Sequence, residues 1–186
     1  MENPRKDDMF KLHPHTPAHL FLDDSPYFIT GAIYQRRCLL AAPELKDWVR
    51  HLIQKNFQAF GWELDEWVIL DNHYHLIGMS RQGSDLPKII KAIHGASAST
   101  IRQKTHCELP VWWNYWDYCP DGEDEYNTKL NYLLMNPIKH EYVSDLNDYP
   151  YSSFSSRLAK TGREELIKQF KTYKEPRYLK DIYDDF

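Results

Sequence analysis

The sequence has few of the features that mark secreted, membrane or zinc-ribbon proteins. It contains only three cysteines, an odd number, and no two of them form a Cys-x-x-Cys pair, which argues against a disulfide framework and a zinc ribbon. No apolar run approaches the roughly 20 residues that cross a bilayer. The first residues, MENPRKDDMFKLHPH, also lack the apolar stretch of a signal peptide. We therefore expect a cytoplasmic protein that does not enter a membrane.

The chain also lacks a strong excess of positive charge. Its net charge of −4 excludes a histone-like polycation, but phosphate binding needs only a local basic face. Such faces are present, because residues 81–104 carry five Lys or Arg against one Asp, and residues 157–180 carry eight against three Glu. The candidate contacts to a nucleic-acid backbone are Arg36, Arg37, Lys88, Lys91, Arg102 and Lys139. The alternative is that these cations simply lie on solvated surfaces.

The hydrophobic pattern predicts four strands and three helices. Strands are expected at residues 27–38, 62–70, 73–79 and 111–116, which are rich in β-branched and aromatic residues. Helices are expected at 43–60, 84–104 and 123–136, where apolar residues recur with the helical period. We expect Pro137 to end the last helix, because the residue before a proline is disfavoured in helical conformation.

The order of these elements is β-α-β-β-α-β followed by a helix. It is typical of a ferredoxin-like split βαβ fold of the α+β class, with an antiparallel sheet, helices on one face and an additional C-terminal helix. We expect this domain to occupy residues 26–156. An extended arm, interrupted by three prolines, is expected at 1–25, and a basic tail at 157–186.

Two histidines with a single residue between them lie in the third expected strand. Side chains alternate along a strand, so His73 and His75 project from one face and Tyr74 from the other. Two neutral imidazoles side by side make half of a divalent-metal site. A His-x-His pair also arises by chance in a chain with nine histidines, so a purely structural role stays open.

The last expected helix places a tyrosine and an asparagine on one face. Tyr132 and Asn136 are four residues apart, about one helical turn. If this helix lies across the histidines, Asn136 adds a neutral oxygen ligand, and the metal polarises a phosphate that Tyr132 attacks to form a phosphotyrosine. The alternatives are that Tyr132 is a residue at the edge of the core and that Asn136 is a helix cap.

Four segments together resemble a known family. They are PYFITGAIYQRR (26–37), VILDNHYHLIG (68–78), LNYLLMNPIKHEYV (130–143) and DYPYSSF (148–154). This combination resembles the REP-associated tyrosine transposases, which are single-tyrosine HUH endonucleases related to the transposases of small insertion sequences. The resemblance implies that His73, His75 and Asn136 bind Mg²⁺ or Mn²⁺ and that Tyr132 is the nucleophile.

The same resemblance implies the substrate and the reaction. The substrate would be single-stranded DNA with a hairpin, either REP-like or an insertion-sequence end. Cleavage would leave a 5′-phosphotyrosine and a free 3′-OH, and reversal by another 3′-OH would give strand transfer. The implied protein is a monomer or a homodimer in which one subunit's tyrosine serves the other.

Three positions depart from the family pattern. Pro120 and Asp121 stand where relatives commonly carry an isoleucine-arginine pair, and Glu141 stands where they often carry glycine. These changes keep open a domesticated protein that binds a DNA hairpin without cutting it. A third hypothesis is a phosphoesterase that uses metal-activated water instead of Tyr132.

A dense aromatic run precedes the acidic loop at 121–125. Its members are Trp112, Trp113, Tyr115 and Trp116. Such residues can stack on splayed bases, but in an alternating strand they can equally belong to the core. Both interpretations stay open from the sequence.

Overall fold

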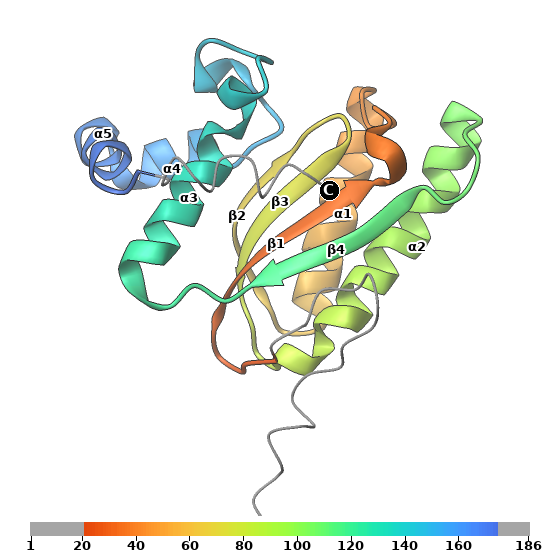
Figure 1. The fold of residues 1–186 in the computed structure, drawn as a ribbon, viewed down its shortest axis with the longest axis horizontal. Coiled ribbons are helices and arrows are strands. Elements are labelled where there is room, and N and C mark those ends of the chain that lie inside the picture. The colour runs from red at the N-terminus through yellow and green to blue at the C-terminus, as the bar shows by residue number, and fades with distance from the viewer. Residues whose placement is uncertain (1–20, 175–186) are drawn as a thin grey trace, which may run out of the picture.

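Four strands form one antiparallel sheet in the computed structural model, which describes residues 21–174 (Figure 1). The strands are β1 (Pro26–Ile33), β2 (Glu63–Ile69), β3 (His73–Met79) and β4 (Trp112–Tyr118). Their order across the sheet is β2-β3-β1-β4, and each neighbouring pair is antiparallel. Most of the expected arm at 1–25 and the end of the expected tail at 157–186 lie outside the described residues.

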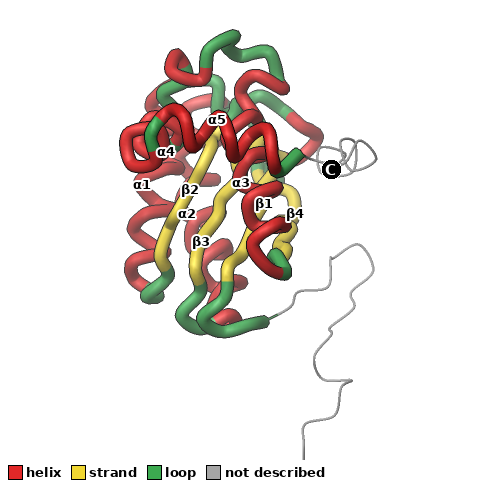
Figure 2. The backbone as a smooth tube through the Cα atoms, turned by 90° about the vertical axis from the view of Figure 1, so that its left-hand side faces the viewer, coloured by secondary structure: helices red, strands yellow, loops and turns green. Residues whose placement is uncertain are grey.

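Helices cover the two faces of this sheet unequally (Figures 1 and 2). On one face lie α1 (Pro43–Ala59) and α2 (Leu86–Thr105). On the other lies α3 (Gly122–Lys139), followed by α4 (Phe154–Thr161) and α5 (Arg163–Thr172). The predicted α+β fold with the ferredoxin-like order is therefore confirmed. Within residues 21–174, the helices are too short or too polar to cross a membrane.

Alternation along the strands separates two hydrophobic cores. Tyr27, Ile29, Tyr74 and Leu76 are buried in the core shared with α1 and α2. The apolar side of α2 is the one that the sequence predicts, with Leu86, Ile89, Ile90, Ile93, Ser97 and Ile101 all buried. The second core joins the opposite face of the sheet to α3, α4 and α5. This second layer carries the candidate site.

The first strand ends earlier than the sequence predicts. We expected it to continue to Cys38, but β1 ends at Ile33 and a 3₁₀ turn follows at Tyr34–Arg36. The reason is local backbone geometry, because Gln35 and Arg36 adopt φ angles of 58° and 53°, which a β-ladder does not accommodate. Arg36 and Arg37 therefore lie in a turn and not at the end of a strand.

The helix α3 continues past Pro137. We expected α3 to end at Asn136, but it continues to Lys139 with Pro137 inside it. Proline removes the bond that its own nitrogen would donate to the Leu133 carbonyl, and its ring crowds that carbonyl, but its fixed φ is compatible with a helix. The final turn is completed when His140 N donates to Asn136 O at 3.0 Å. The other boundaries agree with expectation or differ from it by one or two residues.

The region expected to begin a basic tail contains two helices. Residue 157 lies inside α4, and Leu166 of α5 is 2% exposed in the second core. Asn131 of α3 donates to Gln169 O at 3.0 Å, and Gln169 Nε2 donates back to Asn131 Oδ1 at 2.7 Å. The described part of this region is thus packed against α3.

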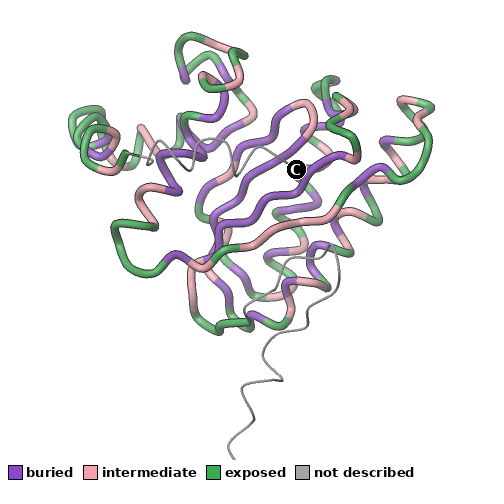
Figure 3. Tube along the Cα trace, viewed as in Figure 1, coloured by how far each residue is buried: buried purple, intermediate pink, exposed green. Residues whose placement is uncertain are grey.

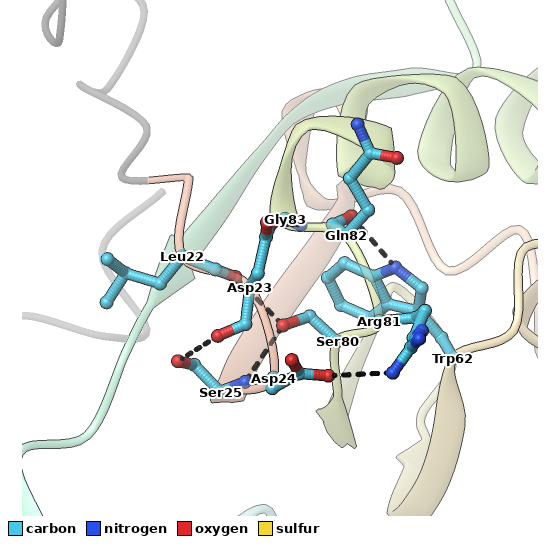
Figure 4. A network of polar contacts seen from close by, with 9 residues as sticks. All are labelled: Leu22, Asp23, Asp24, Ser25, Trp62, Ser80, Arg81, Gln82 and Gly83. Atoms are coloured by element: carbon cyan, nitrogen blue, oxygen red, sulfur yellow. Dashed lines mark hydrogen bonds and ion pairs between the residues drawn. The ribbon is translucent and has the colours of Figure 1, made fainter.

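A polar network secures the start of β1 to the end of β3 (Figure 4). Ser25 N donates to Ser80 Oγ at 3.0 Å, and Ser80 Oγ donates to Leu22 O at 2.8 Å. Gly83 N donates to Asp23 Oδ1 at 2.8 Å beside them. Since the register pairs Pro26 with Met79 at this end, it fixes His73 opposite Ala32 at the other end of the sheet.

Candidate functional site

The two histidines of β3 share one face of the strand, as their spacing predicts, and α3 lies over this face. Tyr74 and Leu76 enter the core on the opposite side, so His73 and His75 share the second face. Both are buried, and their ring centroids lie 4.9 Å apart. The sheet therefore holds two adjacent imidazoles on a rigid strand.

Packing of α3 brings its polar face onto these histidines. Leucines at 130, 133 and 134 are fully buried against the sheet and the C-terminal helices, which orients the helix. The ring of Tyr132 then lies 5.1 Å from that of His75 between centroids, and Asn136 Oδ1 lies 3.3 Å from His73 Nε2. The fold thus brings together the four residues that the sequence singled out.

Hydrogen bonds behind His73 assign its tautomer. Asn72 Nδ2 donates to Arg36 O at 3.3 Å, so Asn72 Oδ1 is the atom that faces His73 Nδ1 at 2.7 Å. Nδ1 therefore carries the proton, and Nε2 presents its lone pair toward Asn136 Oδ1. On the neighbouring histidine, His75 Nδ1 shares a 2.8 Å hydrogen bond with Thr30 Oγ1.

This donor set suits a divalent cation. A ligating histidine typically donates its second ring N–H to an oxygen acceptor, as His73 does to Asn72. Imidazole nitrogen and amide oxygen are neutral, so the ion would keep its full charge. No group of three or more His, Cys, Asp or Glu side chains forms a metal site within residues 21–174. A metal at this position would therefore depend on the asparagine as its third ligand.

Two lysines of α3 approach the ring of the tyrosine. Lys139 Nζ lies 4.7 Å from the centroid of the Tyr132 ring, and Lys129 Nζ lies 5.9 Å from it. Lys129 is 5% exposed and also contacts the rings of Phe28 and Tyr118, at 5.4 and 5.6 Å. The sequence analysis missed Lys129, although its position three residues before Tyr132 on the same helix could have identified it.

A third histidine also joins the cluster. The ring of His140 lies 5.2 Å from that of His73 between centroids. Its sequence spacing gave no reason to single it out, because it follows the end of α3 and is positioned only by the fold.

The remaining predicted cations lie elsewhere. Lys88, Lys91 and Arg102 belong to α2, which covers the opposite face of the sheet, and Lys88 pairs with Asp85 at 2.7 Å. Arg37 donates to the carbonyls of Tyr34 and Glu108, each at 3.0 Å, and to that of Pro110, so it holds the loop before β4. Of the six candidates, the structure brings Lys139 to the ring of Tyr132. DNA contacts by all six stay predictions.

Tyr74, the residue between the two histidines, has a structural role in the other layer. Its hydroxyl lies 2.9 Å from His94 Nε2. Burial raises the pKa of Tyr74 and lowers the pKa of His94 to about 3, so both groups stay neutral at physiological pH. This pair stabilises the core and is separated from the candidate site by the sheet.

Comparison with known proteins gives concordant matches. The family model described as "Transposase IS200 like" matches residues 26–119, which include His73 and His75 and end before α3. The chain is 26% identical over 143 residues to the REP-associated tyrosine transposase of Escherichia coli K12, covering 75% of this chain and 82% of that protein.

A solved structure shares the fold. It is described as a REP-associated tyrosine transposase bound to a REP hairpin, and it superposes with a TM-score of 0.64 at 23% identity. The match covers 76% of this chain and 84% of that one. At this identity the likeness establishes the fold.

Proposed function

The chain belongs to the family of IS200-like transposases, and we propose that it cleaves single-stranded DNA beside a hairpin by forming a covalent bond to Tyr132. The observation that carries this proposal is the meeting of Tyr132 with His73, His75 and Asn136, from a strand and a helix far apart in sequence. A tyrosine beside residues that can hold a metal ion supports phosphodiester cleavage, because a phenol is a weak nucleophile at its ordinary pKa and a metal ion is one means of activating the reaction.

His73, His75 and Asn136 would hold Mg²⁺ or Mn²⁺. The ion, when bound, acts as a Lewis acid that polarises the scissile phosphate and offsets the charge that develops on it. The protein's own contribution is orientation. A hydrogen bond between Thr30 and His75 and another from His73 to Asn72 fix the orientation of the two imidazole rings. The asparagine and the tyrosine lie on one face of α3.

In the proposed step, Tyr132 Oη attacks the phosphorus and the bond to the 3′ oxygen breaks. The phenolic proton is lost and the departing 3′ oxygen is protonated, so the products are a 5′-phosphotyrosine and a 3′-OH. Attack of another 3′-OH on the phosphotyrosine reverses the step and joins the strands. The ammonium groups of Lys129 and Lys139 lie beside the tyrosine ring, where they favour a bound phosphate.

A hairpin as the partner is supported by the solved relative, which is described with a REP hairpin bound. Glu141 has a left-handed backbone with φ of 60°, a conformation that favours glycine, which is the residue that the family resemblance leads us to expect there.

The proposal is tested by a covalent-adduct assay. Single-stranded hairpins from the genomic neighbourhood, labelled at the 3′ end, are incubated with the protein and Mn²⁺ and separated on a denaturing gel. We expect a protein-linked DNA band that disappears with a chelator and in Tyr132→Phe. Tyr126→Phe is the matched control, because it removes a hydroxyl from the same helix, and it should leave the band unchanged.

Two other outcomes would replace the proposal. Hairpins that shift in a native gel but form no adduct with any metal would indicate the binding-only function. Cleavage that survives Tyr132→Phe without an adduct would indicate hydrolysis by activated water.

A further inference from the structure

The edge strand β4 is unusual among the strands in its exposure. β1 and β3 are buried along nearly their whole length, whereas β4 is mostly half-buried (Figure 3). Its sequence, WWNYWDY, is nonetheless the most aromatic in the sheet. A row of large rings on a partly open strand calls for an explanation other than core packing.

The structure divides this aromatic run between the two faces. Trp112 belongs to the core with α1 and α2, where its Nε1 donates to Ser97 Oγ at 2.9 Å and its ring stacks on His94 at 4.3 Å. Tyr115 packs against the same core. Trp116 therefore points to the opposite face, which is the face of the candidate site.

Strand register connects Trp116 directly to the histidines. Trp116 pairs with Thr30 of β1, and Thr30 pairs with His75 of β3, so the three side chains form one row across the sheet. Thr30 also hydrogen-bonds to His75. Since adjacent strands lie about 4.8 Å apart, Trp116 stands roughly 10 Å from His75 in this row. Tyr118 takes the next position along β4 on this face, opposite Phe28.

Two lysines of α3 lie beside this row of side chains. Lys129 extends from α3 over the sheet, and its Nζ lies near both Phe28 and Tyr118. Lys139 approaches Tyr132 from the other end of that helix. Proteins bind single-stranded nucleic acids by combining positively charged side chains with aromatic rings. The charged groups attract the phosphates, and the rings stack on the bases.

We propose that Trp116 stacks on an unpaired base of the DNA strand whose scissile phosphate lies at Tyr132. This inference rests on the proposed function, since it adds a base contact to the same site. Every base presents a π-face, so stacking of this kind tolerates different sequences. Trp116 would therefore hold the strand across the sheet, while recognition of a particular target resides elsewhere.

Binding experiments test the stacking separately from cleavage. All variants carry Tyr132→Phe, so no covalent chemistry intervenes, and the probe is an oligo-dT single strand with one 2-aminopurine, whose fluorescence falls on stacking. With Trp116 intact we expect quenching and saturable binding. Trp116→Ala should abolish the quenching and weaken binding roughly ten- to hundred-fold, while Trp116→Phe, which keeps a ring, should retain most of both.

The matched control is Trp48→Ala, a half-buried tryptophan of α1 in the opposite layer, which should bind the probe as well as the parent. Equal binding and quenching in Trp116→Ala and its parent would overturn the inference, and so would a parent protein that binds no single strand. The phenylalanine variant keeps the test valid if the alanine variant is poorly folded.

The adduct assay distinguishes this inference from the proposed function. An adduct that forms while Trp116→Ala binds normally would leave the function standing and overturn the stacking contact. Stacking without any adduct would preserve the contact in a binding-only protein.

Discussion

His73 Nε2 and Asn136 Oδ1 face each other at 3.3 Å, although β3 and α3 place the two residues 63 positions apart in the sequence. With the His73 proton on Nδ1, both atoms can donate a lone pair to a cation. Both residues are buried, and Asn136 Nδ2 has no hydrogen-bond partner among the described residues. The pair therefore offers two of the three ligands proposed for the divalent cation.

Metal binding should stabilise the folded protein. At a free Mn²⁺ concentration 100 times the dissociation constant, the gain in unfolding free energy is about 2.7 kcal/mol. In a domain of this size that corresponds to a rise in Tm of roughly 5–10 °C. Thermal unfolding with Mn²⁺ and with chelator measures the rise.

The Tm with Mn²⁺ is compared with the Tm with chelator for the same variant, so that the effect of the substitution itself on stability cancels. Tyr132→Phe should keep the metal-dependent rise, because it removes no proposed ligand. Asn136→Ala should lose most of it. An equal rise in wild type and Asn136→Ala would exclude Asn136 as a ligand.

Gly31 of β1 should tolerate no side chain. A Cβ at this position would lie 2.3 Å from Cζ of the buried Tyr74 ring, which is itself tightly packed. We expect Gly31→Ala to lower the unfolding free energy by about 3 kcal/mol, at the upper end of overpacking effects. Urea unfolding measures it.

The control for this substitution is Gly95→Ala in α2. A Cβ there has no atom within 4 Å, and alanine favours a helix over glycine by roughly 0.5–1 kcal/mol. Gly95→Ala should therefore stabilise the protein slightly. If both variants were equally stable, the close contact between Gly31 and Tyr74 would not exist in solution.

The periodicity of the sequence correctly predicted the elements whose hydrophobic pattern is regular. The buried face of α2 follows directly from its apolar spacing, and β3 begins and ends at the predicted residues. His73 and His75 share a face because alternation along a strand is a local geometric property. Tyr132 and Asn136 share a face for the corresponding reason in a helix.

Features that depend on competing or distant interactions escaped prediction. The turn at Tyr34–Arg36 interrupts a run whose composition favours a strand, because two residues adopt left-handed backbone angles there. Pro137 lies within a helix whose packing outweighs the loss of one hydrogen bond. Helical spacing places Lys129 near Tyr132, but its contacts with the rings of Phe28 and Tyr118 depend on how α3 lies over β1 and β4, which no local pattern encodes.

Glu66 should make stability depend on pH. This carboxyl is buried in β2, and burial raises its pKa above the ordinary value of 4.5, although Ser153 and Arg157 partly counteract the shift. At pH values between 4.5 and the raised pKa, the Glu66 carboxyl is protonated in the folded state and ionised in the unfolded state. The contribution of Glu66 to stability therefore falls as pH rises through this window, by about 1.4 kcal/mol per unit of pKa difference.

Glu66→Gln removes this dependence, since the amide has no proton to lose. The unfolding free energy of the variant relative to wild type should rise between pH 4 and pH 7, as urea unfolding at each pH will show. Asp65, whose pKa burial also raises and whose charge raises the pKa of Glu66, is present in both proteins. Parallel pH profiles for the two proteins would contradict the shift in the pKa of Glu66.

Lys129 should accelerate formation of the adduct. Its ammonium group lies 5.9 Å from the Tyr132 ring and is almost fully buried, so its charge is weakly screened. At an effective dielectric constant near 20, two unit charges about 6 Å apart interact by roughly 3 kcal/mol, which sets the scale for the effect of Lys129 on a phosphate bound beside Tyr132. We therefore expect Lys129→Met to slow single-turnover adduct formation by ten-fold or more, while Lys129→Arg retains part of the rate.

Methionine is the informative replacement, because its flexible thioether can fill the space among the three rings and keep the packing. Lys55→Met removes an exposed charge from α1 in the opposite layer and serves as the control for net charge. It should leave the rate unchanged. A Lys129→Met protein that reacts as fast as wild type would mean that Lys129 only packs against the rings of Phe28, Tyr118 and Tyr132, and that the charge beside the nucleophile comes from Lys139 alone.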